Sequence, residues 1–234
     1  EKFLDNNEKD FTDKLSPVYE AISKTRSKLN KDKTLISFIG APWTLLIYML
    51  SLNKDKSSNQ GQVEKKDITL ILQILNNYLS LHIKNQIDAG ADIVQIFDSW
   101  SGLLEKQHLN KFCYEPNYKL VNFCREKKIP VICFPKGINE NYKNFNNIVK
   151  PDGINIDPML EPNWCKKNLK NVVIQGGLDP KILLKSEKEI TDAATKYIET
   201  FRDIPYIFNL GHGLLPETDP DNVEKLIKHY RNFK

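Results

Sequence analysis

The stretch from residue 205 to residue 220 reads PYIFNLGHGLLPETDP. Its apolar start is typical of a buried strand, and glycines on both sides of His212 end that pattern. A helix start follows, with Thr218 or Asp219 as the expected N-cap and Pro220 at the first helical position. The stretch therefore predicts a strand, a loop that carries a histidine, and a helix.

Five other apolar runs of similar length come before this one, and helical patterns separate them. Most are continuous rather than alternating, which is the pattern of strands buried on both faces of a parallel sheet. The clearest helical pattern lies within residues 67–92, with Gly90 as its expected end. The alternation of strands and helices predicts an α/β fold. The six predicted strands are residues 34–40, 93–98, 131–136, 153–157, 172–177 and 206–211.

Small or polar residues end every predicted strand. In a parallel barrel all these ends meet at one mouth, where the active site is built. No G-x-G-x-x-G or P-loop sequence follows a strand, so the sequence gives no support to a nucleotide site. We therefore predict a (β/α)8 TIM barrel. Residues 1–234 would form a single barrel domain, incomplete at its N-terminus, that carries six of the eight strands (3 to 8).

The composition is that of a globular chain. The 234 residues are 40% hydrophobic, with a formal net charge of +4. No apolar run approaches the ~20 residues that cross a bilayer. No basic cluster is interleaved with aromatic residues, as a nucleic-acid platform requires. We expect neither a membrane nor a nucleic-acid partner, and we interpret residues 52–66, rich in lysine and small polar residues, as a flexible surface insertion.

Several residues with metal-binding or acid–base chemistry have simpler interpretations. The four cysteines show no C-x-x-C spacing and are interpreted as packing residues. His82 falls on an apolar helical stripe, which favours a core histidine over a ligand. Asp98, Asp157 and Asp179 follow predicted strands and would make a carboxylate set, but aspartates at strand ends often cap the next helix.

Four segments of the chain resemble, in the same order, segments of the uroporphyrinogen decarboxylase family. They are FIGAPWTLLIYML (38–50), GADIVQIFDSWSG (90–102), VVIQGGLDP (172–180) and FNLGHGLLPETDPDNVEKLI (208–227). The resemblance implies a TIM-barrel lyase of haem biosynthesis, usually a homodimer, without metal or organic cofactor. That family removes four acetate carboxyls from uroporphyrinogen to give coproporphyrinogen, in the cytoplasm or in a plastid.

The resemblance also assigns substrate-binding residues. It implies that the Tyr48 hydroxyl reaches a substrate carboxylate, that Ser99 lies at the mouth and that His212 contacts a propionate. Phe38 and Phe97 match aromatic wall positions, against which a pyrrole face can pack. No catalytic residue is assigned, because the family's aspartate and its arginine-rich RQAGRY segment belong to the first two strands and have no counterpart here.

Each assigned residue also has a structural alternative. Tyr48 would then cap a core beside Trp43, Ser99 would be a helix N-cap, and His212 would bond a neighbouring loop. The chain departs from many family members at Trp100, where they have a smaller or polar residue. The two glycines beside His212 are expected to adopt backbone conformations that other residues avoid, and to let a bulky tetrapyrrole approach.

Two other functions remain open at this point. A corrinoid-dependent methyltransferase shares the barrel but binds zinc through a His-x-Cys pair and a further cysteine, and this chain has no His-x-Cys pair. The second alternative is a non-catalytic barrel remnant that binds a tetrapyrrole or a partner protein.

Overall fold

The computed structural model describes residues 8–50 and 65–233. The predicted insertion lies outside the described residues, except that Lys65 and Lys66 begin a helix. The strands are β1 (Ile36–Gly40), β2 (Ile93–Asp98), β3 (Val131–Pro135), β4 (Gly153–Ile156), β5 (Val173–Gly176) and β6 (Tyr206–Ile207). The α-helices are α1 (Glu8–Lys28), α2 (Pro42–Met49), α3 (Lys65–Asp88), α4 (Lys106–Leu109), α5 (Glu115–Glu126), α6 (Tyr142–Val149), α7 (Pro162–Asn168), α8 (Glu187–Phe201) and α9 (Pro220–Asn232). Short 3-10 or π turns are η1 (Ser101–Leu103), η2 (Asn110–Tyr114), η3 (Asn139–Asn141) and η4 (Pro180–Leu184).

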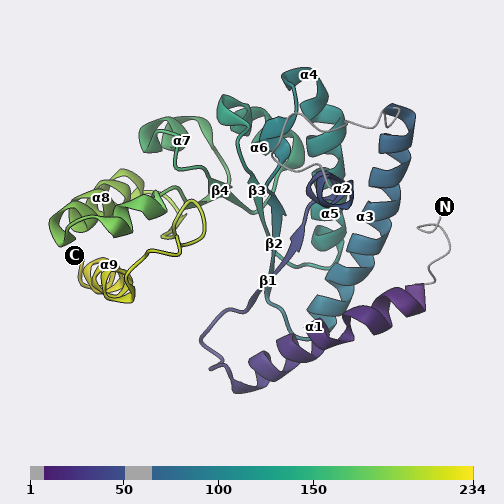
Figure 1. Ribbon diagram of the computed structural model, residues 1–234, viewed down its shortest axis with the longest axis horizontal. Coiled ribbons are helices and arrows are strands. Elements are labelled where there is room, and N and C mark those ends of the chain that lie inside the picture. The colour runs from purple at the N-terminus through teal and green to yellow at the C-terminus, as the bar shows by residue number, and fades with distance from the viewer. Residues whose placement is uncertain (1–7, 51–64, 234) are drawn as a thin grey trace.

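The six strands form one parallel sheet in the order β1-β2-β3-β4-β5-β6. Sequential order is the pattern of a barrel, whereas an open doubly wound sheet reverses its strand order at a switch point. Figure 1 shows the helices that follow β1 to β3 on one side of the sheet and α7, α8 and α9 beyond β4. The predicted number of strands and the α/β class are confirmed.

The sixth strand is shorter than predicted. Only Tyr206 and Ile207 pair with β5, and Leu210 adds an isolated parallel bridge to Leu178. Between them the Asn209 side chain accepts the Leu210 N–H at 2.8 Å, so a local bond replaces the ladder there. Side chains of this type compete with strand pairing in this way.

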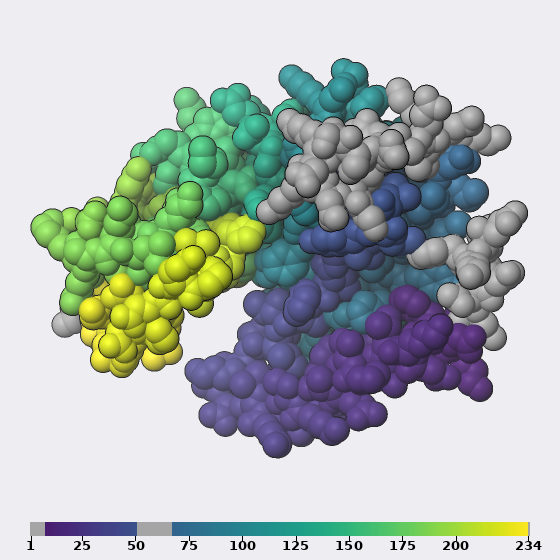
Figure 2. Space-filling view, in the orientation of Figure 1, coloured from purple at the N-terminus to yellow at the C-terminus, as the bar shows by residue number. Residues whose placement is uncertain are grey.

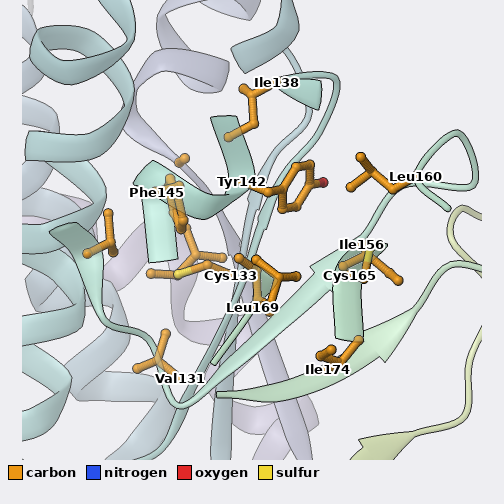
Figure 3. Close-up of a cluster of buried hydrophobic side chains, with 14 of the residues drawn as sticks. Val131, Cys133, Ile138, Tyr142, Phe145, Ile156, Leu160, Cys165, Leu169 and Ile174 are labelled. Carbon is orange, nitrogen blue, oxygen red and sulfur yellow. The ribbon is translucent and has the colours of Figure 1, made fainter. Parts of the chain in front are cut away.

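Alternate residues of each strand face the helices and form the core. Ile39, Ile96, Cys133, Ile154 and Ile174 share one buried cluster with helix residues. Their strand neighbours turn to the opposite, inner face, where a barrel holds its interior. Figure 3 shows the cluster around β3 and β4, where Cys133 and Cys165 lie among aliphatic and aromatic side chains. All four cysteines are free and buried, which confirms their interpretation as packing residues.

Two predicted helix boundaries are confirmed. Helix α3 ends at Asp88, and Gly90 follows with a φ of +109°, a conformation that favours glycine. Helix α9 begins with Pro220 after Asp219, whose carboxylate accepts the N–H of Asp221 at 3.0 Å. Asp219 rather than Thr218 is therefore the N-cap.

Helix α1 packs on α3, near the free edge of β1. The Tyr19 hydroxyl lies 2.9 Å from His82 Nδ1, and Gln86 Nε2 lies 2.7 Å from His82 Nε2. His82 is thus a histidine with partners on both nitrogens, as predicted.

Figure 2 shows a notch between the C-terminal residues, in yellow, and the N-terminal residues, in purple. In the described part of the chain, β1 and β6 each pair on one side only, and none of the helices has the length and apolar character of a membrane span.

Candidate functional site

Close backbone contacts join the loops at the carboxyl ends of β2, β3 and β4. The Gly102 N–H donates to the Lys136 carbonyl at 2.9 Å, and a Cβ on Gly102 would lie 2.9 Å from the Gly137 backbone. Gly137, with a φ of +83°, donates its N–H to Asp157 Oδ2 at 2.7 Å. These glycines let three loops pack closely at one mouth.

The loop that carries His212 joins the same mouth through Gly211. The Gly211 N–H donates to the Leu178 carbonyl at 2.8 Å, and a Cβ on Gly211 would lie 2.7 Å from the ring of Pro158. Neither Gly211 nor Gly213 has a positive φ, and a Cβ on Gly213 would have no neighbour within 4 Å. The expectation of unusual backbone conformations at these glycines is therefore wrong. Gly211 is required by close packing against Pro158.

Asp98 is a buried carboxylate on the helix-facing side of β2. Thr44 Oγ1 donates to its Oδ1 at 2.8 Å, and Asn117 Nδ2 donates to its Oδ2 at 3.0 Å. Burial raises the pKa of Asp98 to about 6, although these hydrogen bonds lower it. The carboxylate ties α2 and α5 to the end of β2 and does not cap a helix.

Asp157 directly follows β4 and is buried. Its Oδ2 accepts the Gly137 N–H and, at 3.1 Å, the hydroxyl of Tyr142. Burial raises its pKa, opposed by these two bonds and by the charges of Lys136 and His212. Asp179 does cap the next turn, because its Oδ1 accepts the Lys181 N–H at 2.9 Å. The three aspartates thus have different roles, and only Asp179 fits the capping interpretation.

An aromatic row crosses the inner face of the sheet. The Phe38 and Phe97 rings are 5.9 Å apart, and the Phe97 and Phe134 rings are 6.2 Å apart, each pair edge to face. Phe38 is 67% exposed, because it lies on the edge strand β1. Two of these rings were predicted from the sequence. Phe134 was not, although strand alternation places it on the same face.

Tyr48 lies on α2, after β1, and Ser99 directly follows β2. Tyr48 is 60% exposed, and its ring meets that of Trp100 at 6.1 Å. Trp43 instead stacks on Phe112, so Tyr48 does not cap a core beside it. Ser99 is partly buried, and the residue at the N-cap of η1 is Trp100, so the N-cap interpretation of Ser99 is wrong.

The backbone of Trp100 holds the β1–β2 side of the mouth together. Its N–H donates to Thr44 Oγ1 at 3.2 Å, and its carbonyl accepts from Trp43 Nε1 at 3.1 Å. Tyr48 and Phe38 also line one groove of about 470 Å³ together with Phe11 and Leu15 of α1.

His212 lies on the other side of the mouth, after β6. It is exposed, and within the described residues no hydrogen bond joins its ring to a neighbouring loop. The structure therefore places Phe38, Phe97, Tyr48 and Ser99 together at β1 and β2, and His212 apart from them beside β4.

Three buried amides lie on the inner face below the mouth. Gln175 Nε2 is 2.9 Å from Asn155 Oδ1 and 3.4 Å from Gln95 Oε1. This cluster was not predicted from the sequence, although polar residues inside apolar strands are a usable signal. Because buried amides are costly unless paired, this cluster fixes the inner layer of the sheet.

Comparison with known proteins places the chain in a family. The protein-family model described as uroporphyrinogen decarboxylase (URO-D) matches residues 2–233 of this chain. A uroporphyrinogen decarboxylase of Orientia tsutsugamushi (strain Boryong) is 41% identical over 227 residues, which are 94% of this chain and 66% of that protein. One of Rickettsia bellii is 40% identical over 240 residues, which cover 100% of this chain and 69% of that protein. The chain thus spans about two thirds of the length of these curated relatives.

Solved structures support the fold. A methyltransferase from Methanosarcina mazei aligns with a TM-score of 0.77 at 19% identity, covering 92% of this chain and 64% of that one. A putative vitamin-B12-independent methionine synthase from Listeria monocytogenes aligns with a TM-score of 0.61 at 14% identity, covering 92% and 68%. At such identities the likeness concerns the fold alone, and together with the family match it confirms the TIM-barrel class. The resemblance of the four segments is confirmed as well, and the chain belongs to the uroporphyrinogen decarboxylase family.

Proposed function

We propose that the protein containing this chain is a uroporphyrinogen decarboxylase. It would remove the four acetate carboxyls of uroporphyrinogen as CO2, leave methyl groups and yield coproporphyrinogen, without metal or organic cofactor. The observation that carries the proposal is 41% identity over 227 residues to a uroporphyrinogen decarboxylase. Because the chain spans about two thirds of that relative, the activity of the whole protein is an inference from family membership.

The geometry of the mouth is compatible with this substrate. Loss of CO2 from an acetate on a pyrrole leaves an electron pair, and protonation of a ring carbon turns the pyrrole into a cationic, electrophilic ring that can accept this pair. The enzyme must therefore supply a proton donor, an anion near the pyrrole N–H groups and partners for the substrate carboxylates. Proton transfer to the resulting methylene then completes the methyl group, and loss of the proton from the ring carbon restores the pyrrole.

This chain supplies part of that set. Phe38 and Phe97 offer an aromatic surface on the inner face, where a pyrrole ring can pack. Tyr48 and His212 are exposed on opposite sides of the mouth, where each can donate a hydrogen bond to a carboxylate. We infer that the leading acid and the arginines of the family reaction are supplied from outside residues 1–234.

Turnover is the direct test. The protein, with any upstream sequence that its gene encodes, is incubated anaerobically with uroporphyrinogen, and the products are oxidised and separated by chromatography. Porphyrins with seven to four carboxyls should accumulate without added metal or nucleotide. If no carboxyl is lost, decarboxylation is refuted, and the non-catalytic tetrapyrrole-binding or partner-binding alternative is favoured instead.

The methyltransferase alternative requires a zinc site, and the described residues do not provide one. They contain no group of three or more histidine, cysteine, aspartate or glutamate side chains that could hold a metal ion. Burial also raises the pKa of Cys113, Cys124, Cys133 and Cys165, which keeps these thiols protonated. Zinc analysis of the purified protein, and turnover with a chelator present, separate the two functions.

We also propose that the protein is a homodimer and works in the cytoplasm or in a plastid, as the family does. Light scattering coupled to size-exclusion chromatography tests the first statement. Fractionation of source cells tests the second.

A further inference from the structure

A lysine, Lys136, directly follows strand β3, and none of the other five strands of the described residues is directly followed by one. Lys136 is partly buried. Within residues 8–50 and 65–233 its ammonium has no hydrogen bond and no carboxylate within ion-pair distance. A lysine that buries part of its stem and has no protein partner for its ammonium leaves that ammonium available to an anionic ligand.

The backbone at Lys136 is held firmly, and only the side chain is left to move. Its N–H donates to the Asp98 carbonyl at 3.1 Å, and its own carbonyl accepts from Gly102 N–H and Ser101 Oγ, both at 2.9 Å. The close contact between Gly102 and Gly137 adds to this. The backbone of Lys136 is thus fixed, whereas its long side chain can change conformation and move the ammonium.

The nearest anion does not need the ammonium as a contact. Asp157 Oδ2 already accepts the Gly137 N–H and the Tyr142 hydroxyl, at 2.7 and 3.1 Å. The positive charge of Lys136 nonetheless acts on Asp157, and so does that of His212. Gly137, the residue after Lys136, bonds to this carboxyl, and Gly211, the residue before His212, packs on Pro158, so both positions adjoin Asp157 although they follow different strands.

Packing keeps this arrangement in place. Gly211 rests on the ring of Pro158, the residue after Asp157, and this contact sets His212 beside the end of β4. Gly137 sets Lys136 on the other side of Asp157. The mouth consequently presents two donors, one after β3 and one after β6, beside Asp157.

We propose that Lys136 is a further substrate-binding residue, whose ammonium binds one carboxylate of the tetrapyrrole on the same side of the mouth as His212. This inference rests on the proposed function. A lysine suits the role because its compact charge on a four-carbon stem can follow a carboxylate through small changes in position. Successive decarboxylation of four similar rings requires such tolerance.

The test compares Lys136→Met, which keeps the length of the stem, with Lys136→Arg, which keeps the charge. With uroporphyrinogen as substrate, Lys136→Met should raise KM ~10- to 100-fold, as expected for the loss of a charged hydrogen bond. Lys136→Arg should restore most of the affinity, whereas loss of a purely structural lysine would lower the melting temperature without such rescue. Lys143→Met, on an exposed position of α6, is the matched control and should behave as wild type.

A binding assay separates this proposal from the proposed function. Quenching of tryptophan fluorescence by oxidised uroporphyrin gives an affinity without turnover. Added salt should weaken the binding of uroporphyrin to wild type more than its binding to Lys136→Met. If wild type binds uroporphyrin but does not decarboxylate uroporphyrinogen, the proposed function fails, and the binding loss in Lys136→Met still decides the role of Lys136. Equal affinity of wild type and Lys136→Met, or no binding by wild type, overturns the proposal.

Discussion

The hydroxyl of Thr44 bridges a buried carboxylate and a loop of the mouth. It donates to Asp98 Oδ1 at 2.8 Å and accepts the N–H of Trp100 at 3.2 Å. Replacing it in Thr44→Val keeps the shape and removes both bonds. The variant should lose stability, and the size of the loss should depend on pH because one of the two partners titrates.

The magnitude follows from the pKa of Asp98. Its rise from 3.8 to about 6 costs about 3 kcal/mol of stability at ~1.36 kcal/mol per unit, a loss that develops between about pH 4 and pH 6 as pH rises. The Thr44 bond lowers this pKa, so Thr44→Val should move it above 6 and extend the loss to higher pH. A hydrogen bond to a charged group contributes ~1.5–3 kcal/mol, or about one to two pKa units.

Urea unfolding at about pH 5 and about pH 8.5 measures the effect. The difference in unfolding free energy between wild type and Thr44→Val should be larger at the higher pH by ~1.5–3 kcal/mol. Ser101→Ala is the control, because Ser101 Oγ donates to the backbone carbonyls of Asp98 and Lys136 and, within the described residues, not to the Asp98 carboxylate. The loss of unfolding free energy caused by Ser101→Ala should be the same at both pH values. An equal cost of Thr44→Val at both pH values would refute the reasoning about Asp98.

Three further predictions concern the mouth and the sheet. His212→Ala and Tyr48→Phe should each lower kcat/KM about ten- to a hundredfold with an unchanged circular dichroism spectrum, and wild-type kinetics would assign both residues a structural role. Gly211→Ala should lower the melting temperature, because its Cβ would meet a proline ring at 2.7 Å, whereas Gly213→Ala, with nothing within 4 Å, should not; equal melting temperatures would contradict the packing argument. Residues 1–234 expressed alone should be inactive and associate through unpaired edges, and a monodisperse, active product in size-exclusion chromatography and a decarboxylation assay would show this wrong.

Strands β2 to β5 could be predicted because nearly all of their residues are buried or partly buried, and β1 because its residues are mostly apolar although Ile36 and Phe38 are exposed. Continuous apolar runs located β1 to β5 within one or two residues, and the order of the sheet follows from short βα connections. The end of β6 could not be predicted in this way. It depends on the Asn209 side chain and on the single neighbour of this strand, neither of which changes the apolar pattern.

The sequence could propose single residues of the candidate site, but it could not predict contacts between side chains that come from distant segments. Phe38, Phe97 and Tyr48 were proposed from the segments that resemble the family, and their role in substrate binding stays a prediction. The partners of Asp98 were not predicted, because Thr44 and Asn117 come from helices 54 residues before and 19 residues after it, and their approach depends on how α2 and α5 cover β2. Gly211 was singled out for the wrong reason, since a contact with a proline in another loop leaves no local pattern.

The two free edges of the sheet differ in what they offer to another strand. Leu35 O and Ala41 N bond to β2, so residues 36, 38 and 40 turn their backbone groups to the free edge of β1. Gln86 Nε2 donates a hydrogen bond to the Phe38 carbonyl at 3.3 Å. The groove of about 470 Å³ beside this edge is mostly lined by apolar side chains. By contrast, β6 is two residues long, and Phe208 after it is stacked on Tyr230 of α9 at 4.4 Å. A pairing strand can bury side chains only at β1, and we therefore expect association of residues 1–234 to run through that edge.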